Sequence, residues 1–542
     1  MKQSKMIPLL LGLTLTLTGC EFSFGPFNPN SDNSSSEIDA SNGENNQNSE
    51  TLPKKEMGAL PTLEPAASVH EGAGYHKVNN FTFTAADYHK ATEEYFLPSI
   101  GTQKVLVIPV EFKNAKAEKI NENLTRNQVH DKIHNAFFGS SEDTEWESLR
   151  SYYYKSSGGS LIIEGEVAPF YQTGISTSSF ENLSHVRDPE NAEYYDPTWT
   201  ILENAIEDIK AKGTIDLREF DQNNDGFIDA VFMVYMANYS TSEDSSLWAY
   251  QFFDYDSYYM EDDDVNSPAP FNYAWASIYF MFEGYGDYKI DAHTYIHESG
   301  HILGLDDYYT YTEDDWGALG GVDMMDYNIG DHNGYSKMAL DWKLPYYVDG
   351  TESVTEMTLV PGDLVVINDS WNKTAFDEYL LLEFYTPTGL NDKDLNGYPG
   401  NGLSTFTEAG LKLYHVDSRL GKYDNQTDEL VSYTKTLEVG NNYYPYIAMS
   451  NSSDPEKEDD YKLIHLIEPN GGNSLITDPG SLADDSFLFY AGDKFIPSQY
   501  DKKNSGFVRN NGIRFNDGTR INYEISVTSV NPSEAKVTIT KI

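Results

Sequence analysis

Cysteine is almost absent from this chain of 542 residues, in which Cys20 is the only example. A single cysteine forms no internal disulfide, and the body of the chain can hold neither a cysteine-ligated zinc site nor a catalytic thiol. A protein of this length without disulfides depends for its stability on packing and on any metal that it binds.

Basic residues are also scarce, because 37 Lys and Arg stand against 86 Asp and Glu and give a formal net charge of −49. Such a chain repels nucleic acid phosphates, so we expect no DNA or RNA partner. The acidic excess favours solubility, and part of it is suited to bind hard cations such as Ca²⁺. Hydrophobic residues make up 39% of the chain and aromatics 14%, which excludes global disorder.

Long apolar runs are missing except near the N-terminus, where two lysines precede an apolar run at residues 6–17. That run is short for a membrane span and is typical of a signal peptide, which we place at 1–19. It ends in the letters LTGC, which resemble a bacterial lipobox. The resemblance implies cleavage before Cys20, lipid attachment to its sulfur, and an exported protein anchored at the outer face of the cell membrane, from which it could be shed. The alternative is an ordinary signal peptide with an accidental cysteine.

The length predicts two or three folded units together with unstructured segments. Residues 20–60 are predicted to be a disordered tether, because the stretch 28–50 is nearly all Asn, Ser, Asp, Glu and Gly. Such a stretch has too little apolar area to offset the entropy cost of ordering. Residues 61–100 have two interpretations, a prosegment or the first structural layer.

Strand and helix patterns alternate over residues 101–345, which predicts a mixed α/β domain. The expected strands are β-branched apolar runs at 104–112, 160–167 and 229–236. The expected helices lie between them, at 146–157 and 198–212. After residue 346 the helical periodicity fades and short strand-like runs recur between turns. This change predicts a β-rich, sandwich-like C-terminal domain at 346–542.

The segment at 291–309, DAHTYIHESGHILGLDDYY, contains the residues best suited to catalysis. On a helix, His297 and His301 lie one turn apart, where two imidazoles can bind one Zn²⁺. Glu298 follows the first ligand and would serve as general base for the hydrolytic water. Gly304 can end the helix in a left-handed turn, which would bring Asp307 round as the third ligand. The alternative is a helix with two surface histidines, since the HExxH spacing alone is only suggestive.

The letters HESGHILGLDDYY, followed by GGVDMMDYNIGDHNGYSKMALDW, resemble the immune inhibitor A-type zinc peptidases, which are metzincin-like. Their pattern is HExxHxxGxxD, then a methionine turn beneath the metal and a YSKxxLGW-like helix. Met325 matches the turn methionine, and residues 335–342 match the closing helix. The resemblance covers roughly residues 104–417. It implies a zincin-type catalytic domain, with a mixed sheet, an active-site helix and a horizontal cleft, that hydrolyses peptide bonds in extracellular proteins or peptides.

The sequence departs from the family pattern at the third ligand and beside it. Asp306 stands where a proline is usual, so two adjacent carboxylates compete for the metal, and the register favours Asp307. His293 lies one turn before the first ligand. Because a catalytic zinc needs an open position, we expect His293 to act outside the ligand sphere or to be exposed.

One tyrosine is a further catalytic candidate. Tyr327 lies two residues after Met325, where some metzincins carry a tyrosine that stabilises the oxyanion. The alternative is a packed aromatic side chain in a tyrosine-rich protein.

A second cation site is predicted in the loop at 221–229, DQNNDGFID. Oxygen donors occupy positions one, three, five and nine, with glycine at six, as in the first part of an EF-hand loop. The predicted calcium ligands are Asp221, Asn223, Asp225, Asp229 and the backbone carbonyl of Phe227. A full EF-hand is excluded, since position twelve is Phe232 and a strand follows. The alternative is an Asx-rich turn without an ion.

Two rival functions come from other classes of protein. One is a catalytically inactive, zincin-like lipoprotein that binds partners as an adhesin, and the other is a calcium-stabilised carbohydrate-binding protein. Glu298 argues against the first, because a purely structural zinc site needs no base. Neither rival explains the ordered series of helix, glycine turn, acid and methionine turn. The oligomeric state and the cleavage specificity stay open.

Overall fold

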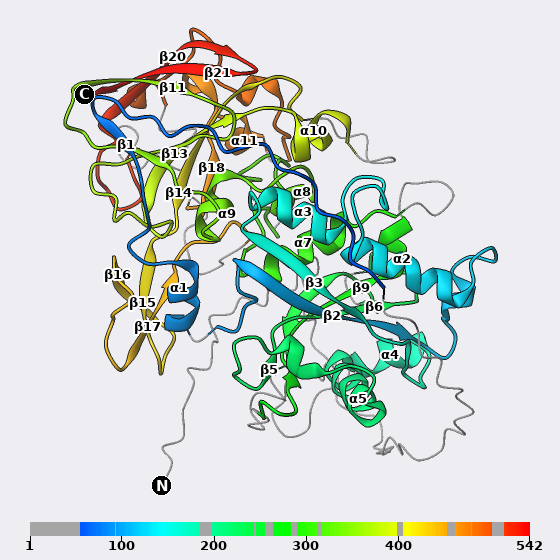
Figure 1. Cartoon of the computed structure of the whole chain (residues 1–542). Coiled ribbons are helices and arrows are strands. Elements are labelled where there is room, and N and C mark those ends of the chain that lie inside the picture. The colour runs from blue at the N-terminus through cyan, green and yellow to red at the C-terminus, as the bar shows by residue number, and fades with distance from the viewer. Residues whose placement is uncertain are drawn as a thin grey trace.

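The computed structural model describes residues 55–92, 94–184, 197–242, 245–254, 264–282, 290–311, 316–397, 405–452, 461–478, 480–500 and 514–542. The predicted signal peptide, Cys20 and the tether as far as residue 54 lie outside this range. Among the described helices, none has the length and apolar character that a membrane span requires. Two modules lie side by side, one rich in helices and one built mainly of strands (Figure 1).

The helix-rich module is built on one sheet. Its strands follow the order β3 (Leu161–Val167), β2 (Gly101–Glu111), β6 (Val231–Tyr235), β9 (Asn272–Ser277) and β7 (Tyr250–Phe253), with the short β4 (Tyr171–Gln172) pairing the end of β2. The first four strands run parallel, and β7 lies antiparallel to β9 at the edge. The sequence predicted three of these strands and missed β7 and β9.

Helices cover both faces of this sheet, which explains why its strands are apolar without alternation. One face packs against α2 (Arg126–Phe138), α3 (Leu149–Ser156) and α7 (His293–Ile302), and the other against α4 (Thr177–Ser184) and α5 (Pro197–Lys212). The module is therefore mixed α/β, as the sequence predicted, with α7 held against the sheet.

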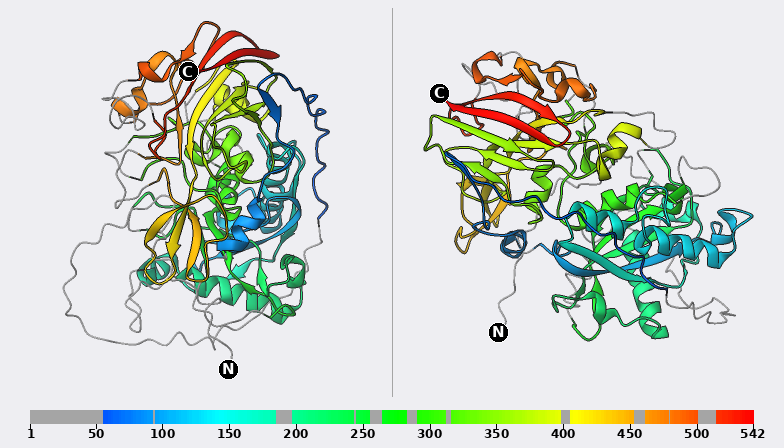
Figure 2. Two further views of the ribbon diagram at one scale, coloured as in Figure 1. Left: turned by 90° about the vertical axis from the view of Figure 1, so that its left-hand side faces the viewer. Right: turned by 45° about the horizontal axis from the view of Figure 1, so that its top comes forward.

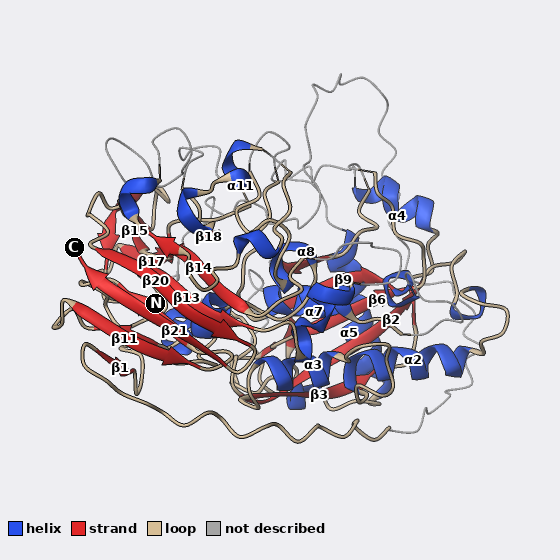
Figure 3. Cartoon of the chain, turned by 90° about the horizontal axis from the view of Figure 1, so that it is seen from above, coloured by secondary structure: helices blue, strands red, loops and turns tan. Residues whose placement is uncertain are grey.

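The strand-rich module contains two larger sheets. One runs β1 (Tyr75–Lys77), β10 (Tyr346–Val348), β12 (Leu364–Ile367), β13 (Glu378–Tyr385), β14 (Gly410–Asp417) and β18 (Ile464–Leu466). The other runs β11 (Val354–Leu359), β21 (Glu534–Lys541), β20 (Tyr523–Asn531) and β19 (Lys494–Phe495). Apolar side chains of both sheets form one buried cluster, and Figure 3 shows the strands gathered on one side of the molecule and most helices on the other.

Smaller elements complete the described chain. A three-stranded sheet has the order β16 (Leu430–Thr434), β15 (Leu420–Asp424) and β17 (Tyr443–Ile447). The remaining short strands and helices are β5 (Phe227–Ile228), β8 (Ala269–Pro270), α1 (Ala85–Thr92), α8 (Met324–Tyr327), α9 (Gly334–Ala339), α10 (Asp392–Asn396) and α11 (Ser474–Thr477).

The N-terminal segment belongs to both modules. The backbone N–H of Gly58 donates to the carbonyl of Phe138 at the end of α2, at 2.7 Å. Further on, β1 adds to the strand-rich module by pairing antiparallel with β10. Figure 2 shows this segment running along one side of the molecule between the modules. The two interpretations of residues 61–100, a prosegment or a structural layer, stay predictions.

Candidate metal centre

Helix α7 lies between the sheet of the helix-rich module and the strand-rich module, and hydrogen bonds fix it from two directions. The phenol of Tyr295 donates to the carbonyl of Ser277 at the end of β9, at 2.6 Å. The phenol of Tyr153 on α3 donates to the carbonyl of Ile296, at 2.7 Å. The Asp291 carboxylate accepts the N–H of His293 at 3.0 Å and marks the start of the helix.

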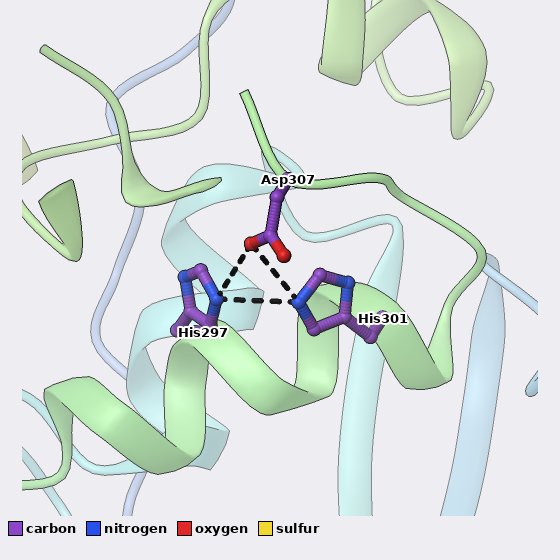
Figure 4. A group of neighbouring side chains, drawn as sticks. All are labelled: His297, His301 and Asp307. Atoms are coloured by element: carbon purple, nitrogen blue, oxygen red, sulfur yellow. Dashed lines mark hydrogen bonds and ion pairs between the residues drawn. The ribbon is translucent and has the colours of Figure 1, made fainter. Parts of the chain in front are cut away.

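Three of the residues named from the sequence meet beside this helix. Nε2 of His297 and Nε2 of His301 lie 3.2 Å apart, and Oδ1 of Asp307 is 3.1 Å from the first and 3.3 Å from the second (Figure 4). All three side chains are buried. Among the described residues, only this group brings three such donor atoms within 4.8 Å of one another.

The backbone fixes the tautomer of each histidine. Nδ1 of His297 faces the carbonyl of Met324 at 2.8 Å, and Nδ1 of His301 faces the carbonyl of Leu305 at 2.7 Å. A carbonyl accepts only, so each Nδ1 carries the proton and each Nε2 presents a lone pair. Two lone pairs and a carboxylate oxygen that face one another at such distances need a positive charge between them.

The spacing of the three atoms fits a tetrahedral metal ion. With bonds of about 2.0–2.1 Å, such an ion holds its ligand atoms about 3.3 Å apart. The observed separations are 3.1 to 3.3 Å. Burial acts to lower the pKa of His301, but Asp307 outweighs it and raises that pKa, so the site favours positive charge. The group therefore suits a metal cofactor.

A glycine turn brings Asp307 to this position, as the sequence predicted. Gly304 has a φ of +95°, which a residue with a side chain rarely adopts. The N–H of Leu305 then donates to the carbonyl of Gly300 at 2.9 Å and closes the helix. Asp306 is only half-buried and lies outside the group of three. Of the two adjacent carboxylates, Asp307 is the one that faces the histidines.

Met325 lies directly beneath the helix at Gly300. A Cβ added to Gly300 would overlap the Met325 sulfur, so this glycine permits the close approach. Asp323 holds the turn by accepting the N–H of Met325 at 2.7 Å and that of Asn333 at 2.6 Å. Burial raises the pKa of Asp323 to about 8. Met325 is fully buried, in the place that the methionine turn predicts.

Glu298 is buried beside His297, and its Oε2 has no hydrogen-bond partner. Burial raises the pKa of Glu298 to about 8, while His297 acts to lower it and Asp307 to raise it. A carboxylate with an open oxygen and a raised pKa is suited to exchange a proton near neutral pH.

Two other residues named from the sequence are His293 and Tyr327. His293 Nδ1 is 2.8 Å from Oδ2 of Asp291, so an acid at the helix start holds it. Tyr327 ends α8 with 47% of its surface exposed. Within the described part of the chain, no hydrogen bond joins Tyr327 to the three converging side chains.

The tyrosines that approach the centre are Tyr309 and Tyr311, which the sequence argument missed. The phenol of Tyr311 donates to Oδ2 of Asp307 at 2.6 Å. Burial, and then the charges of Asp307 and Glu298, raise the pKa of Tyr309. Their position just after the third ligand, in the letters DDYYTY, was the available signal.

The predicted calcium loop folds as a series of turns. Asp221 accepts the N–H groups of Asp225 and Gly226, each at 3.0 Å, and Asp225 accepts that of Phe227 at 2.9 Å. Burial, with Asp225 and Asp221 nearby, raises the pKa of Asp229 to about 7. The loop thus gathers three carboxylates, and the backbone takes up several of their oxygens.

Comparison with known families locates a catalytic domain in this chain. Residues 97–320 match the family described as immune inhibitor A peptidase M6, catalytic domain. The match covers less than half of the chain and contains the three converging side chains and Glu298. It ends before Asp323 and Met325, and the strand-rich module lies outside it. No curated protein matches the chain.

Proposed function

We propose that this chain, a member of the immune inhibitor A peptidase family and thus a metallopeptidase that hydrolyses peptide bonds, is a zinc-dependent endopeptidase with Glu298 as its general base. The observation that supports it most directly is the convergence of two imidazole nitrogens and one carboxylate oxygen within 3.3 Å of one another in a buried site. Two nitrogens and one oxygen form a ligand set that catalytic zinc accepts, with a position left open for water.

The residues around the metal position have separate tasks. A bound zinc ion would polarise the scissile carbonyl and make the attacking water more acidic. Glu298 takes the proton of that water on its open Oε2 and passes it to the leaving amine. Met324 and Leu305 orient the two imidazoles through their carbonyls, and Tyr311 orients Asp307.

An extended substrate has a strand available for pairing. β7 is the antiparallel edge of the catalytic sheet, and among the described strands its only partner is β9. We propose that a peptide adds to β7 by main-chain hydrogen bonds, which places its scissile bond near α7. Extracellular proteins or peptides would be the substrates.

Replacement of Glu298 by Gln tests this mechanism. The amide keeps the size of the side chain but cannot accept the proton, so we expect zinc to stay bound while peptide cleavage falls to background. Glu356→Gln, on the exposed face of β11, is the matched control and should leave both unchanged. Undiminished cleavage by the Glu298 variant would refute the assignment of Glu298 as the base. A wild-type protein that binds no zinc would refute the assignment of zinc as the metal.

An inactive surface-binding lipoprotein or adhesin is the second candidate, since it could keep the same ligands. Zymography with and without a zinc chelator separates the two functions. We also propose a lipid anchor at Cys20, which predicts that Cys20→Ala releases the protein from the membrane fraction. Retention of that variant in the membrane fraction would contradict the anchor.

Calcium binding by the 221–229 loop is a further part of the proposal. Burial, together with nearby carboxylates, raises the pKa of Asp225 and that of Asp229, and a divalent cation would offset this cost of ionisation. Removal of calcium with EGTA should then lower the melting temperature while zinc stays bound. An unchanged melting curve would favour the Asx-rich turn without an ion.

A further inference from the structure

The loop that carries Asp307 is held from the strand-rich module. The backbone N–H of Tyr311 donates to the carbonyl of Ser452 at 2.7 Å. The amide of Asn451 donates through Nδ2 to the carbonyl of Tyr308 at 3.0 Å. Two consecutive residues of the segment after β17 therefore hold the loop at Tyr308 and at Tyr311, on either side of Tyr309. Both lie more than a hundred residues beyond the end of the family match at residue 320.

Asn451 is itself anchored in the strand-rich module. Its Nδ2 also donates to the carbonyl of Ile464 at 2.9 Å, and its Oδ1 accepts the N–H of Ile464 at 3.0 Å. Ile464 begins β18, which pairs with β14 in the larger sheet. Asn451 is only 1% exposed, so water competes little for these bonds. One side chain thus links the loop of the third ligand to a sheet strand.

The link continues to the metal-facing carboxylate. Ser452 fixes the backbone of Tyr311, and the phenol of Tyr311 occupies Oδ2 of Asp307 at 2.6 Å. The other oxygen, Oδ1, is thereby turned toward the two histidines. On the far side of the loop, the N–H of Tyr308 donates to the carbonyl of Met325 at 2.8 Å. The loop is therefore clamped between the methionine turn and the Asn451 segment.

We propose that Asn451 is a positioning residue for the metal centre, and that the strand-rich module is needed to aim the third ligand. This inference rests on the proposed function, in which Asp307 binds zinc. Loss of the Asn451 amide leaves the Tyr308 and Ile464 carbonyls without their donor and lets the loop move. Groups that orient metal ligands typically change metal affinity by about 10- to 100-fold when they are removed.

The test compares Asn451→Ala with Asn372→Ala in the full-length protein. Asn372 is a matched control, because its amide also bridges backbone groups of the strand-rich module, at Phe376 and Thr374, far from α7 along the chain. Zinc affinity is measured by competition with a chelator. We expect Asn451→Ala to weaken it by about tenfold or more, and Asn372→Ala to leave it unchanged. Equal affinities of Asn451→Ala and the wild type would overturn the proposal.

Two further readouts separate positioning from a general loss of stability. In cobalt-loaded protein, the visible spectrum reports the geometry of the ligands, and we expect it to change in the Asn451 variant only. At saturating metal, kcat should fall more than KM rises, because the ligand geometry rather than the substrate strand is affected. A spectrum identical to that of the wild type would also overturn the proposal.

Hydrogen exchange of the wild type keeps the proposal testable should the variant not fold. Coupling is reciprocal, so zinc must strengthen the clamp if the clamp strengthens zinc binding. Zinc should slow exchange at the amides of Tyr311 and Ile464, but not at that of Thr374, which bonds to Asn372 at 2.9 Å. Zinc binding without such slowing would overturn the clamp alone, whereas absence of zinc binding would overturn the proposed function.

Discussion

The two modules differ in how far apart along the chain their parts lie. In the helix-rich module, the two histidines, Glu298 and Asp307 all fall within residues 297–307, and the helix and turn that carry them are local structures. In the strand-rich module, one sheet takes its first strand from residues 75–77 and its last from 464–466. The residues of the candidate metal centre thus lie close together in the sequence, whereas the sheet of the module beside it is formed from distant parts of the chain. The hydrogen bond between Asn451 and Tyr308 joins the locally formed site to a module whose strands come from distant parts of the chain.

The largest effect should come from His301→Ala, which removes one of the three converging side chains within residues 297–307. This change leaves Asp307 buried beside a single imidazole, so we expect loss of bound zinc, loss of peptidase activity to background and a lower melting temperature. His293→Ala is the control, about two turns earlier on the helix, where Asp291 holds the ring. Metal content and melting curves check both variants, and zinc retained by the His301 variant would contradict the ligand assignment.

A smaller but still clear effect is expected from Gly300→Ala. The new Cβ would overlap the sulfur of Met325, which is fully buried and has little room to move. Overpacking of this kind costs about 1–3 kcal/mol, so the melting temperature should fall by several degrees and activity with it. Gly317→Ala is the matched control, because nothing lies within 4 Å of its added Cβ. Equal melting temperatures for the two variants would show that the methionine turn tolerates displacement.

The local part of this comparison is also the part that the sequence could predict. Helix α7 and the turn at Gly304 follow from spacing and from glycine chemistry over a few residues, whereas the role of Met325 was implied by the family resemblance. The edge strand β7 and its neighbour β9 were missed, since their sequences YQFF and NYAWAS carry no clear alternation.

Long-range contacts could not be predicted for a physical reason. Nothing near Tyr75 says that it will lie opposite Val348, and nothing near Asn451 points to Tyr308. Such pairings depend on complementary surfaces formed only after each part has folded. The family pattern drew attention to Tyr327, whose catalytic role stays a prediction, but not to Tyr311, whose phenol donates to Asp307.

A third prediction compares these two tyrosines. Tyr311→Phe removes the phenol that holds Oδ2 of Asp307, so zinc affinity should fall by about tenfold. Tyr327→Phe should leave zinc affinity unchanged. Chelator competition measures both affinities, and a steady-state assay shows whether the second variant alters kcat. A kcat loss of about 10²-fold in Tyr327→Phe with full zinc binding would assign the oxyanion role to Tyr327 after a rearrangement.

The smallest effect is expected at the 221–229 loop, which lies in the helix-rich module but outside its metal centre. Folding raises the pKa of Asp229 to about 7, from about 3.9 in an unfolded chain. Between these values the folded state holds a proton that the unfolded state has lost, so stability falls as pH rises from about 4 to about 7. Without calcium, Asp229→Asn should therefore be more stable than the wild type at pH 8 and not at pH 4.

Calcium should raise the wild-type melting temperature more at pH 8 than at pH 5, because the ion binds the ionised carboxylates. The melting temperature of the Asn variant should rise less with calcium. If calcium does not change the wild-type melting temperature at pH 8, the loop is a hydrogen-bonded turn without an ion.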